Sequence, residues 1–275
     1  MKRTHIIAAL SSCLIFFAAL TIQAAHAQIP ASAQAMAEAQ GPSAKAQDNL
    51  QRQFTVDFSK NPPVRFEAMN PGEQGGDGLS LPRRIAAAVV ARDKPDPHYI
   101  ADLGSYTGEF LEAFMERFPK SRGQWTEPVD GNENNAKIRL ARFGDHVSYV
   151  IGCPARDISQ GCIPKDADVI ITSWVSIHQP LDGMAKVFKG VYDQLPSGGW
   201  FADLDHVGLA GSDWEKPLTE ARKEFHAKTE GPPAHLKTPT PTLEDQLAAF
   251  KVAGFDDVRV IWCSFTDVLF MARKK

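Results

Sequence analysis

A short acidic and glycine-containing segment is the first place in the chain where residue types and spacing suggest chemistry. Residues 102–108 read DLGSYTG and lie between an apolar run and an amphipathic pattern. Gly104 permits a tight turn, and Gly108 permits close approach of the backbone or of the next helix. That helix would direct its N-terminal amide groups at a bound molecule. The segment therefore predicts a ligand-binding turn.

The spacing of this turn differs from that of dinucleotide-binding turns. The GxGxxG fingerprint has its further glycines two and five residues after the first, whereas Gly104 and Gly108 are four residues apart with Tyr106 between them. A pyrophosphate could not approach closely past the Tyr106 side chain. Asp102 precedes the first glycine, where its carboxylate can meet a cation instead of a phosphate.

Two further residues whose side chains could take part in binding or catalysis follow later apolar runs. Glu127 ends the run 123–127, and the two acceptor oxygens of its carboxylate suit a cis-diol. His178 comes shortly after the run 168–173 and could act as a general base, although a single histidine is more often structural.

A polar trio, Asp203, Asp205 and His206, stands at the end of the run 200–204. Such a trio could hold a metal ion. No matching acid follows the run 168–173, so we expect the three residues to be polar groups on the substrate side and expect no metal site.

These residues need a scaffold that brings the ends of several strands together. Seven apolar runs predict strands, at 99–101, 123–127, 147–151, 168–173, 200–204, 258–262 and 268–272. Amphipathic patterns predict helices over 84–92, 110–118, 130–143, 184–195 and 242–254. This alternation predicts a parallel sheet with helices on both faces. No helix separates the last two strands, so one of them should be antiparallel. The predicted fold class is therefore α/β, Rossmann-like and doubly wound, with a seven-stranded, mainly parallel sheet and an antiparallel C-terminal strand.

The N-terminal region has a different character. Residues 1–27 have a positive start, an apolar centre and a final AHA, which predicts a signal peptide cleaved after Ala27. An uncleaved anchor and a lipoprotein site at Cys13 are less favoured alternatives, because the apolar run is short and its best part follows Cys13.

The rest of the chain divides into two parts. Residues 28–53 read as a flexible linker and 54–275 as one domain, in which 208–241 is a lid-like insertion. We expect an exported protein, periplasmic or secreted, with no stable membrane span after cleavage.

Charge and cysteine content narrow the possible partners. The formal net charge is −3 without a long basic or acidic run, so we expect no nucleic-acid partner.

Cleavage of the signal peptide would leave Cys153, Cys162 and Cys263, an odd number with at least one unpaired thiol. An oxidising compartment would permit a bridge between Cys153 and Cys162. The slightly favoured interpretation is that all three are small buried apolar residues.

The turn at 102–108 resembles the first motif of class I S-adenosylmethionine-dependent methyltransferases, an acidic residue followed by xGxGxG. Asp102, Gly104 and Gly108 match this motif, and Tyr106 departs from it, as in some small-molecule members of the family. The resemblance implies that Gly104 and its neighbours Ser105 and Tyr106 line the methionine part of the cofactor.

The resemblance extends over roughly residues 80–275 and implies roles for further residues. Glu127 would bind the ribose hydroxyls. After the run 147–151 the family often has Gly-Asp-Ala beside the adenine, and here the residues are Gly152-Cys153-Pro154-Ala155-Arg156-Asp157. Cys153 stands in the place of the acid, Pro154 and Ala155 follow it beside the adenine, and Asp157 could substitute for the acid if the loop folds back. Ser173 and Trp174 would pass under the cofactor, and His178 would face the transferred methyl group.

The function implied by the resemblance is methyl transfer from S-adenosylmethionine to a small-molecule acceptor. Positioning and desolvation can supply much of the catalysis, because the sulfonium is already activated. A catalytically inactive binding protein of the cell envelope is the alternative, because an exported enzyme would lack a donor made in the cytosol. A nucleotide-dependent oxidoreductase is disfavoured by the glycine spacing.

Overall fold

The structure is a computed structural model that describes residues 79–104, 106–155, 158, 161–209, 213–214, 216–218, 220–221 and 240–275. The predicted signal peptide, the linker, the start of the domain at residue 54, Ser105 and most of the insertion 208–241 lie outside the described residues.

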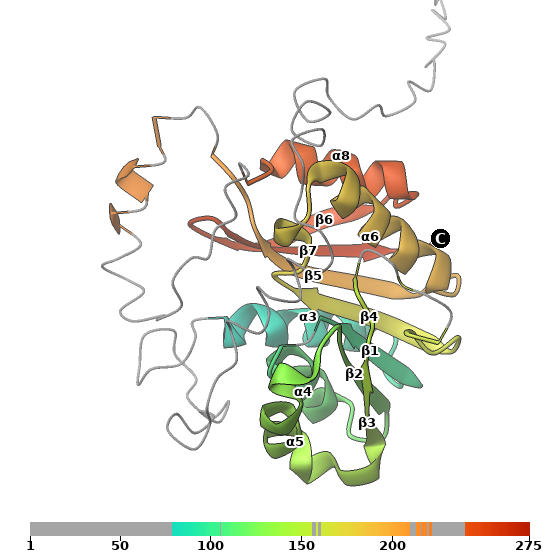
Figure 1. Cartoon of the computed structure of the whole chain (residues 1–275). Helices are drawn as coiled ribbons and strands as arrows, with labels where there is room; N and C mark the ends of the chain where they lie inside the picture. Colours follow the sequence, from blue (N-terminus) through green and yellow to red (C-terminus); the bar gives the residue numbers. More distant parts are fainter. Residues whose placement is uncertain are drawn as a thin grey trace, which may run out of the picture.

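Seven strands form one sheet (Figure 1). They are β1 Tyr99–Leu103, β2 Arg122–Glu127, β3 Val147–Ile151, β4 Ala167–Ser173, β5 Trp200–His206, β6 Val258–Ser264 and β7 Asp267–Arg273. Their order is β3-β2-β1-β4-β5-β7-β6. Strands β1 to β5 pair in parallel, and β7 is antiparallel to both β5 and β6. The predicted fold class, including the antiparallel C-terminal strand, is confirmed.

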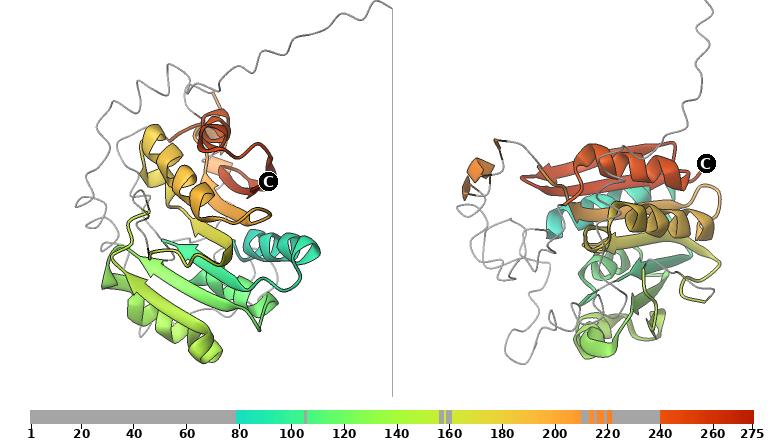
Figure 2. Two further views of the ribbon diagram at one scale, coloured as in Figure 1. Left: turned by 90° about the vertical axis from the view of Figure 1, so that its right-hand side faces the viewer. Right: turned by 45° about the horizontal axis from the view of Figure 1, so that its top comes forward.

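Helices cover both faces of this sheet (Figure 2). One face carries α3 Ser80–Asp93, α4 Glu109–Arg117 and α5 Glu133–Leu140, and the other carries α6 Leu181–Gln194 and α8 Leu243–Ala253. The apolar strand residues alternate between the two layers, because successive side chains of a strand point to opposite faces. In β4, Ile170 packs with α6 and α8, whereas Val169 and Ile171 pack with α3 and α4.

The ends of the helices follow from local sequence. Thr242 and Asp245 form the predicted capping box at the start of α8, and Gly254 ends that helix with a left-handed φ of 110°.

The helix expected over 130–143 is interrupted in the structure. A 3-10 turn, η1 Asp130–Asn132, precedes α5, and η2 Ala141–His146 follows it, with non-helical Gly144 inside. Glycine permits that departure, so the pattern of apolar residues overstated the length of the helix.

Only β3 has the bounds that the sequence predicted, and the other six strands extend further. β1 reaches Leu103 and β5 reaches His206, so Asp102 and Asp205 belong to strands and not to the loops beyond them.

Over the described ranges, no helix is long and apolar enough to span a membrane.

Candidate functional site

The carboxyl ends of β1, β2, β4 and β5 meet at one edge of the sheet, where ligands bind in open α/β folds. The turn after β1 has left-handed backbone at Gly104 with φ 66°, at Tyr106 with φ 50° and at Gly108 with φ 86°. A Cβ atom at Gly104 would overlap Cγ2 of Val175, which follows β4. Glycine at position 104 is therefore required both by backbone conformation and by the approach of the β4 loop.

Asp102 fixes the helix that follows this turn. Its buried Oδ2 accepts a hydrogen bond from the backbone N–H of Leu111 at 3.1 Å. Its carbonyl accepts one from Oγ1 of Thr126 on β2 at 2.7 Å. The carboxylate therefore holds the first turn of α4 against the end of β1. Its contact with a cation stays a prediction.

A hydrogen bond joins the turn to the end of β2. The backbone N–H of Tyr106 donates to Oε1 of Glu127, and Nε1 of Trp125 donates to the Tyr106 carbonyl at 3.0 Å. Glu127 is buried, and this burial raises the pKa of its carboxyl group to about 8. The Tyr106 amide lowers that pKa, and the nearby Asp102 carboxylate raises it. Glu127 thus lies beside the glycine turn, as its predicted role requires.

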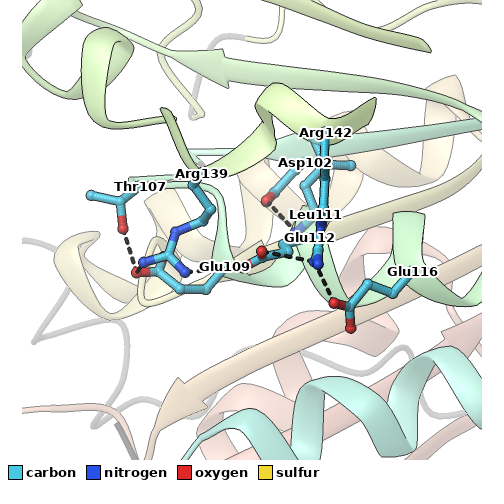
Figure 3. Close-up of polar contacts among 8 residues, drawn as sticks. All are labelled: Asp102, Thr107, Glu109, Leu111, Glu112, Glu116, Arg139 and Arg142. Carbon is cyan, nitrogen blue, oxygen red and sulfur yellow. Dashed lines mark hydrogen bonds and ion pairs between the residues drawn. The ribbon is translucent and has the colours of Figure 1, made fainter. Parts of the chain in front are cut away.

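Arginine side chains from α5 and η2 hold α4 in place (Figure 3). Arg139 contacts Glu112 at 3.0 Å and Glu109 at 3.1 Å, and its side chain is only 7% exposed. Arg142 contacts Glu112 at 2.9 Å and also pairs with Glu116. Burial raises the pKa of Glu112, and the charge and hydrogen bond of Arg139 oppose that rise. Because α4 begins directly after the turn, this network also fixes the turn.

The loop after β3 is closed by a disulfide bond between Cys153 and Cys162, whose Cα atoms are 5.6 Å apart. Both cysteines are buried, as expected, but the favoured interpretation that they are unbridged was wrong, and the alternative of a bridge is the one that the structure shows. The loop folds back so that the Cys162 carbonyl accepts a hydrogen bond from the Gln124 side chain at 2.5 Å, and this return brings the two sulfurs together. Cys263 is free and exposed, contrary to the burial expected for it. Cys153 therefore offers no thiol to an adenine ring, while Pro154 and Ala155 follow it in the same loop.

The β4 end carries buried polar atoms that face no partner. Trp174 has a left-handed φ of 55°, and its backbone N–H donates to the Leu204 carbonyl at 3.0 Å. In the part of the chain that is described, Oγ of Ser173 and Nε1 of Trp174 at the end of β4 are buried without a hydrogen-bond partner, and so is Oδ1 of Asn132 in η1 after β2. Such atoms are costly unless something satisfies them, which suits a polar ligand at this edge.

Asp203 and Asp205 are buried inside the fold, so the expectation that they face a substrate was wrong. Ser176 Oγ donates to Oδ2 of Asp203 at 3.2 Å and also to Asp205, and the Ile177 N–H donates to Asp205 at 2.8 Å. Burial raises the pKa of both carboxyl groups. The two aspartates therefore anchor η3 Ser176–His178 to β5. His178, the predicted base, is the last residue of η3 and is half-buried.

Sequence reasoning missed two residues of this edge. Ser176 and Asp267 contact the polar trio at the end of β5, yet neither stands in a motif. Asp267 is found only through the register of β5 with β7, which no local pattern of the sequence gives. Among the described residues, no group of three or more His, Cys, Asp or Glu side chains is placed to hold a metal ion.

Solved structures share this architecture. A protein of Nostoc punctiforme assigned to the O-methyltransferases has a TM-score of 0.56 at 17% identity, over 71% of this chain and 56% of its own. Human N-acetylserotonin methyltransferase, solved with S-adenosylmethionine, has a TM-score of 0.52 at 15% identity, over 71% and 52%.

This chain has the methyltransferase fold. It spans little more than half the length of these two proteins. Another protein with the same fold comes from Bordetella parapertussis and is described as a possible exported protein. Its TM-score is 0.55 at 12% identity, over 88% of this chain and 93% of its own. No protein-family model matches the sequence, and no curated protein matches it either.

Proposed function

We propose that this chain binds S-adenosylmethionine at the carboxyl edge of its sheet and transfers the methyl group to a small-molecule acceptor. The observation that carries the proposal is the hydrogen bond between Tyr106 and Glu127. It brings the glycine turn and the acidic end of β2 together, as a ligand with an amino-acid part and a ribose part requires. The human methyltransferase with this fold was solved with S-adenosylmethionine bound.

The residues at this edge fit the cofactor. Gly104 gives the turn its left-handed backbone and lets the β4 loop pack against it, and Glu127 would supply carboxylate oxygens for the two ribose hydroxyls. The unsatisfied atoms of Ser173, Trp174 and Asn132 offer further polar contacts. The bound cofactor would supply an activated methyl group on a sulfonium. The chain would orient that group and exclude water from it.

Calorimetric titration of the full chain with S-adenosylmethionine and S-adenosylhomocysteine tests this proposal. We expect micromolar binding of both, and much weaker binding by Glu127→Ala. Glu244→Ala is the matched control, because Glu244 is an exposed glutamate on α8, which packs on the other face of the sheet. A folded protein without affinity for either compound would contradict the proposal.

We further propose that the chain is exported, with cleavage after Ala27. The disulfide bond supports this, because such bonds persist in oxidising compartments. The proposal is tested by the mass of the protein recovered from the cell envelope or medium, which should correspond to a chain beginning at Gln28.

Export favours a second candidate, a catalytically inactive binding protein of the envelope. If the chain binds no cofactor in the titration but retains another small molecule through purification, this second candidate replaces the first.

A further inference from the structure

Three buried side chains at the carboxyl end of β5 make contacts that need one more hydrogen than an ionised pair of aspartates supplies. Oγ of Ser176 lies 3.2 Å from Oδ2 of Asp203 and also contacts Oδ2 of Asp205. All three residues are 0% exposed. A serine hydroxyl has one hydrogen and a carboxylate has none, so two carboxylates would leave one oxygen facing a lone pair of Oγ. Such a contact is unfavourable inside a protein, and one carboxyl group therefore needs a hydrogen of its own.

The remaining contacts of the two aspartates favour Asp203 as the residue that carries this hydrogen. Asp205 accepts backbone hydrogen bonds from Ile177 at 2.8 Å and from His206 at 2.8 Å, and donors of this kind favour the ionised form. Among the described residues, Oδ1 of Asp203 is buried without a hydrogen-bond partner. A carboxylate is costly in that position, whereas a carboxylic acid can donate its hydrogen to Ser176.

The electrostatic surroundings act in the same sense. Burial and the neighbouring Asp205 carboxylate raise the pKa of Asp203, and the hydrogen bond with Ser176 lowers it. Burial also raises the pKa of Asp205, but its hydrogen bonds and the nearby His206 lower it. The proton is therefore held more tightly at Asp203 than at Asp205.

The elements around the pair offer no neutralising ion pair within the described residues. Asp203 and Asp205 alternate with Phe201 on the face of β5 that α6 and α8 cover. Neither aspartate pairs with a Lys or Arg of the described chain. The other titratable groups at this end of the neighbouring elements are His178 of η3, His206 of β5, Asp267 of β7, Asp182 of α6, and Glu244 and Asp245 of α8. A second negative charge on the pair would therefore be poorly compensated.

We propose that Asp203, Ser176 and Asp205 form a latch that holds η3 on β5 only while Asp203 carries a proton. In this latch Asp203 donates to Oγ of Ser176, Ser176 donates to Asp205, and Asp205 holds the negative charge. Loss of the proton leaves two buried carboxylates with one hydrogen between them. Their repulsion then favours a state in which η3 has left β5 and water reaches the pair.

The latch acts on the candidate cofactor site through Val175. This residue directly precedes Ser176, and its Cγ2 lies 2.4 Å from where a Cβ of Gly104 would be. Movement of η3 away from β5 would withdraw Val175 from the turn after β1. The three latch residues are therefore positioning residues, and this last consequence rests on the proposed function.

Nuclear magnetic resonance can detect the proton in the full chain labelled with carbon-13 in its aspartate carboxyl groups. At neutral pH, the resonance that disappears in Asp203→Asn should have the chemical shift of a carboxylic acid. The resonance that disappears in Asp205→Asn should have the shift of a carboxylate. Two carboxylates, or a proton on Asp205, would overturn the assignment.

The dependence of stability on pH counts the same proton independently. An unfolded aspartate loses its proton near pH 4, whereas Asp203 keeps it in the folded chain, so stability falls as pH rises between the two pKa values. From about pH 5 to 7, the unfolding equilibrium constant of the wild type should rise relative to that of Asp203→Asn by up to about tenfold per unit. Glu127, whose pKa is also raised, is present in both proteins and cancels in the comparison.

Urea denaturation measures these profiles. Asp193→Asn is the matched control, because it removes a half-exposed aspartate from α6, and its profile should follow that of the wild type. Parallel profiles for the wild type and Asp203→Asn would show that Asp203 carries no proton.

Hydrogen exchange of the η3 amides tests the latch itself. The amide of Asp203→Asn can donate to Ser176 as the acid does, so protection at neutral pH should match the wild type. Asp205→Asn places a donor where an acceptor is needed, and exchange at 176–178 should be at least about tenfold faster. The reverse order of the two variants would overturn the proposal.

The same exchange measurement in alkaline solution tests the dependence on the proton. The wild type should lose protection of η3 that Asp203→Asn retains, when both are compared at the same pH. Equal protection in the two proteins up to the pH at which the Asp203 resonance shows ionisation would overturn the latch.

Binding of S-adenosylhomocysteine to the same samples tests the link to the cofactor site. At neutral pH, Asp203→Asn should bind about as tightly as the wild type, and Asp205→Asn at least about tenfold more weakly. Equal binding by an Asp205→Asn protein with a released η3 would overturn the link through Val175. A wild type without affinity would remove the proposed function, while resonance, unfolding and exchange still decide the latch.

Discussion

Gly104 carries two constraints at one residue, a left-handed φ of 66° and the contact with Val175. Replacement by alanine should cost about 1–2 kcal/mol for the backbone and roughly 1–3 kcal/mol more for the overlap. We also expect loss of affinity for S-adenosylmethionine, because the turn must shift.

Gly198→Ala is the control for this substitution. Gly198 has a similar φ of 78°, and its would-be Cβ meets only Nη2 of Arg273 at 3.7 Å, an ordinary van der Waals distance, so it separates backbone strain from steric overlap. Urea unfolding and calorimetry give both quantities. Equal destabilisation by the two variants would contradict the role assigned to Val175.

The raised pKa of Glu127 makes cofactor binding depend on pH. Below its pKa of about 8 the free protein holds a proton on this carboxyl group, and the ribose hydroxyls need the carboxylate as acceptor. Binding must then release that proton, so affinity for S-adenosylhomocysteine should rise with pH, by up to about tenfold per unit, and level off above pH 8. Glu127→Gln should bind weakly with no such slope. Calorimetry from pH 6 to 9 measures it, and a flat wild-type profile would count against the ribose contact.

Among the elements, α4 depends most on charged contacts. Arg139 is almost fully buried between Glu109 and Glu112. Its replacement by alanine would leave buried carboxylates without their counter-charge, and we expect a loss of roughly 3–5 kcal/mol in the free energy of unfolding.

An exposed ion pair provides the comparison for Arg139. Lys189 and Asp193 form a pair on α6 that is about half exposed, and Asp193→Asn should cost less than about 0.5 kcal/mol. Urea denaturation of both variants gives the difference. Similar losses would mean that the Arg139 network stabilises α4 no more than a surface pair does.

For the whole molecule, the disulfide bond links stability to redox conditions. It closes a loop with a sequence separation of 9. Loop closure of this length contributes about 2–3 kcal/mol through the unfolded chain. We expect dithiothreitol, or Cys153→Ser with Cys162→Ser, to lower the unfolding free energy by that amount.

Cys263→Ser is the control for the disulfide, because Cys263 is free and exposed. Its unfolding free energy should match that of the wild type. Peptide mapping without reduction should recover Cys153 and Cys162 in one linked fragment. Two separate fragments, from protein isolated under oxidising conditions, would show that the bond does not form.

Local patterns determined much of this protein before any contact was known. Apolar runs and amphipathic spacing predicted all seven strands, because burial on both faces of a sheet imposes those patterns directly on the sequence. The missing helix between β6 and β7 predicted the antiparallel strand. The types of residue at 102–108 and at Glu127 predicted the candidate site, because motif chemistry lies in neighbouring residues.

Tertiary structure decided what depends on residues far apart in the chain. Only the return of the loop after β3 paired Cys153 with Cys162, and only the sheet order placed Asp267 opposite His206. The burial of Asp203 and Asp205 likewise follows from the packing of η3 on β5. The sequence alone determined which residues could do chemistry, and the strand order determined which of them meet, because pairing across a sheet joins segments that no local pattern connects.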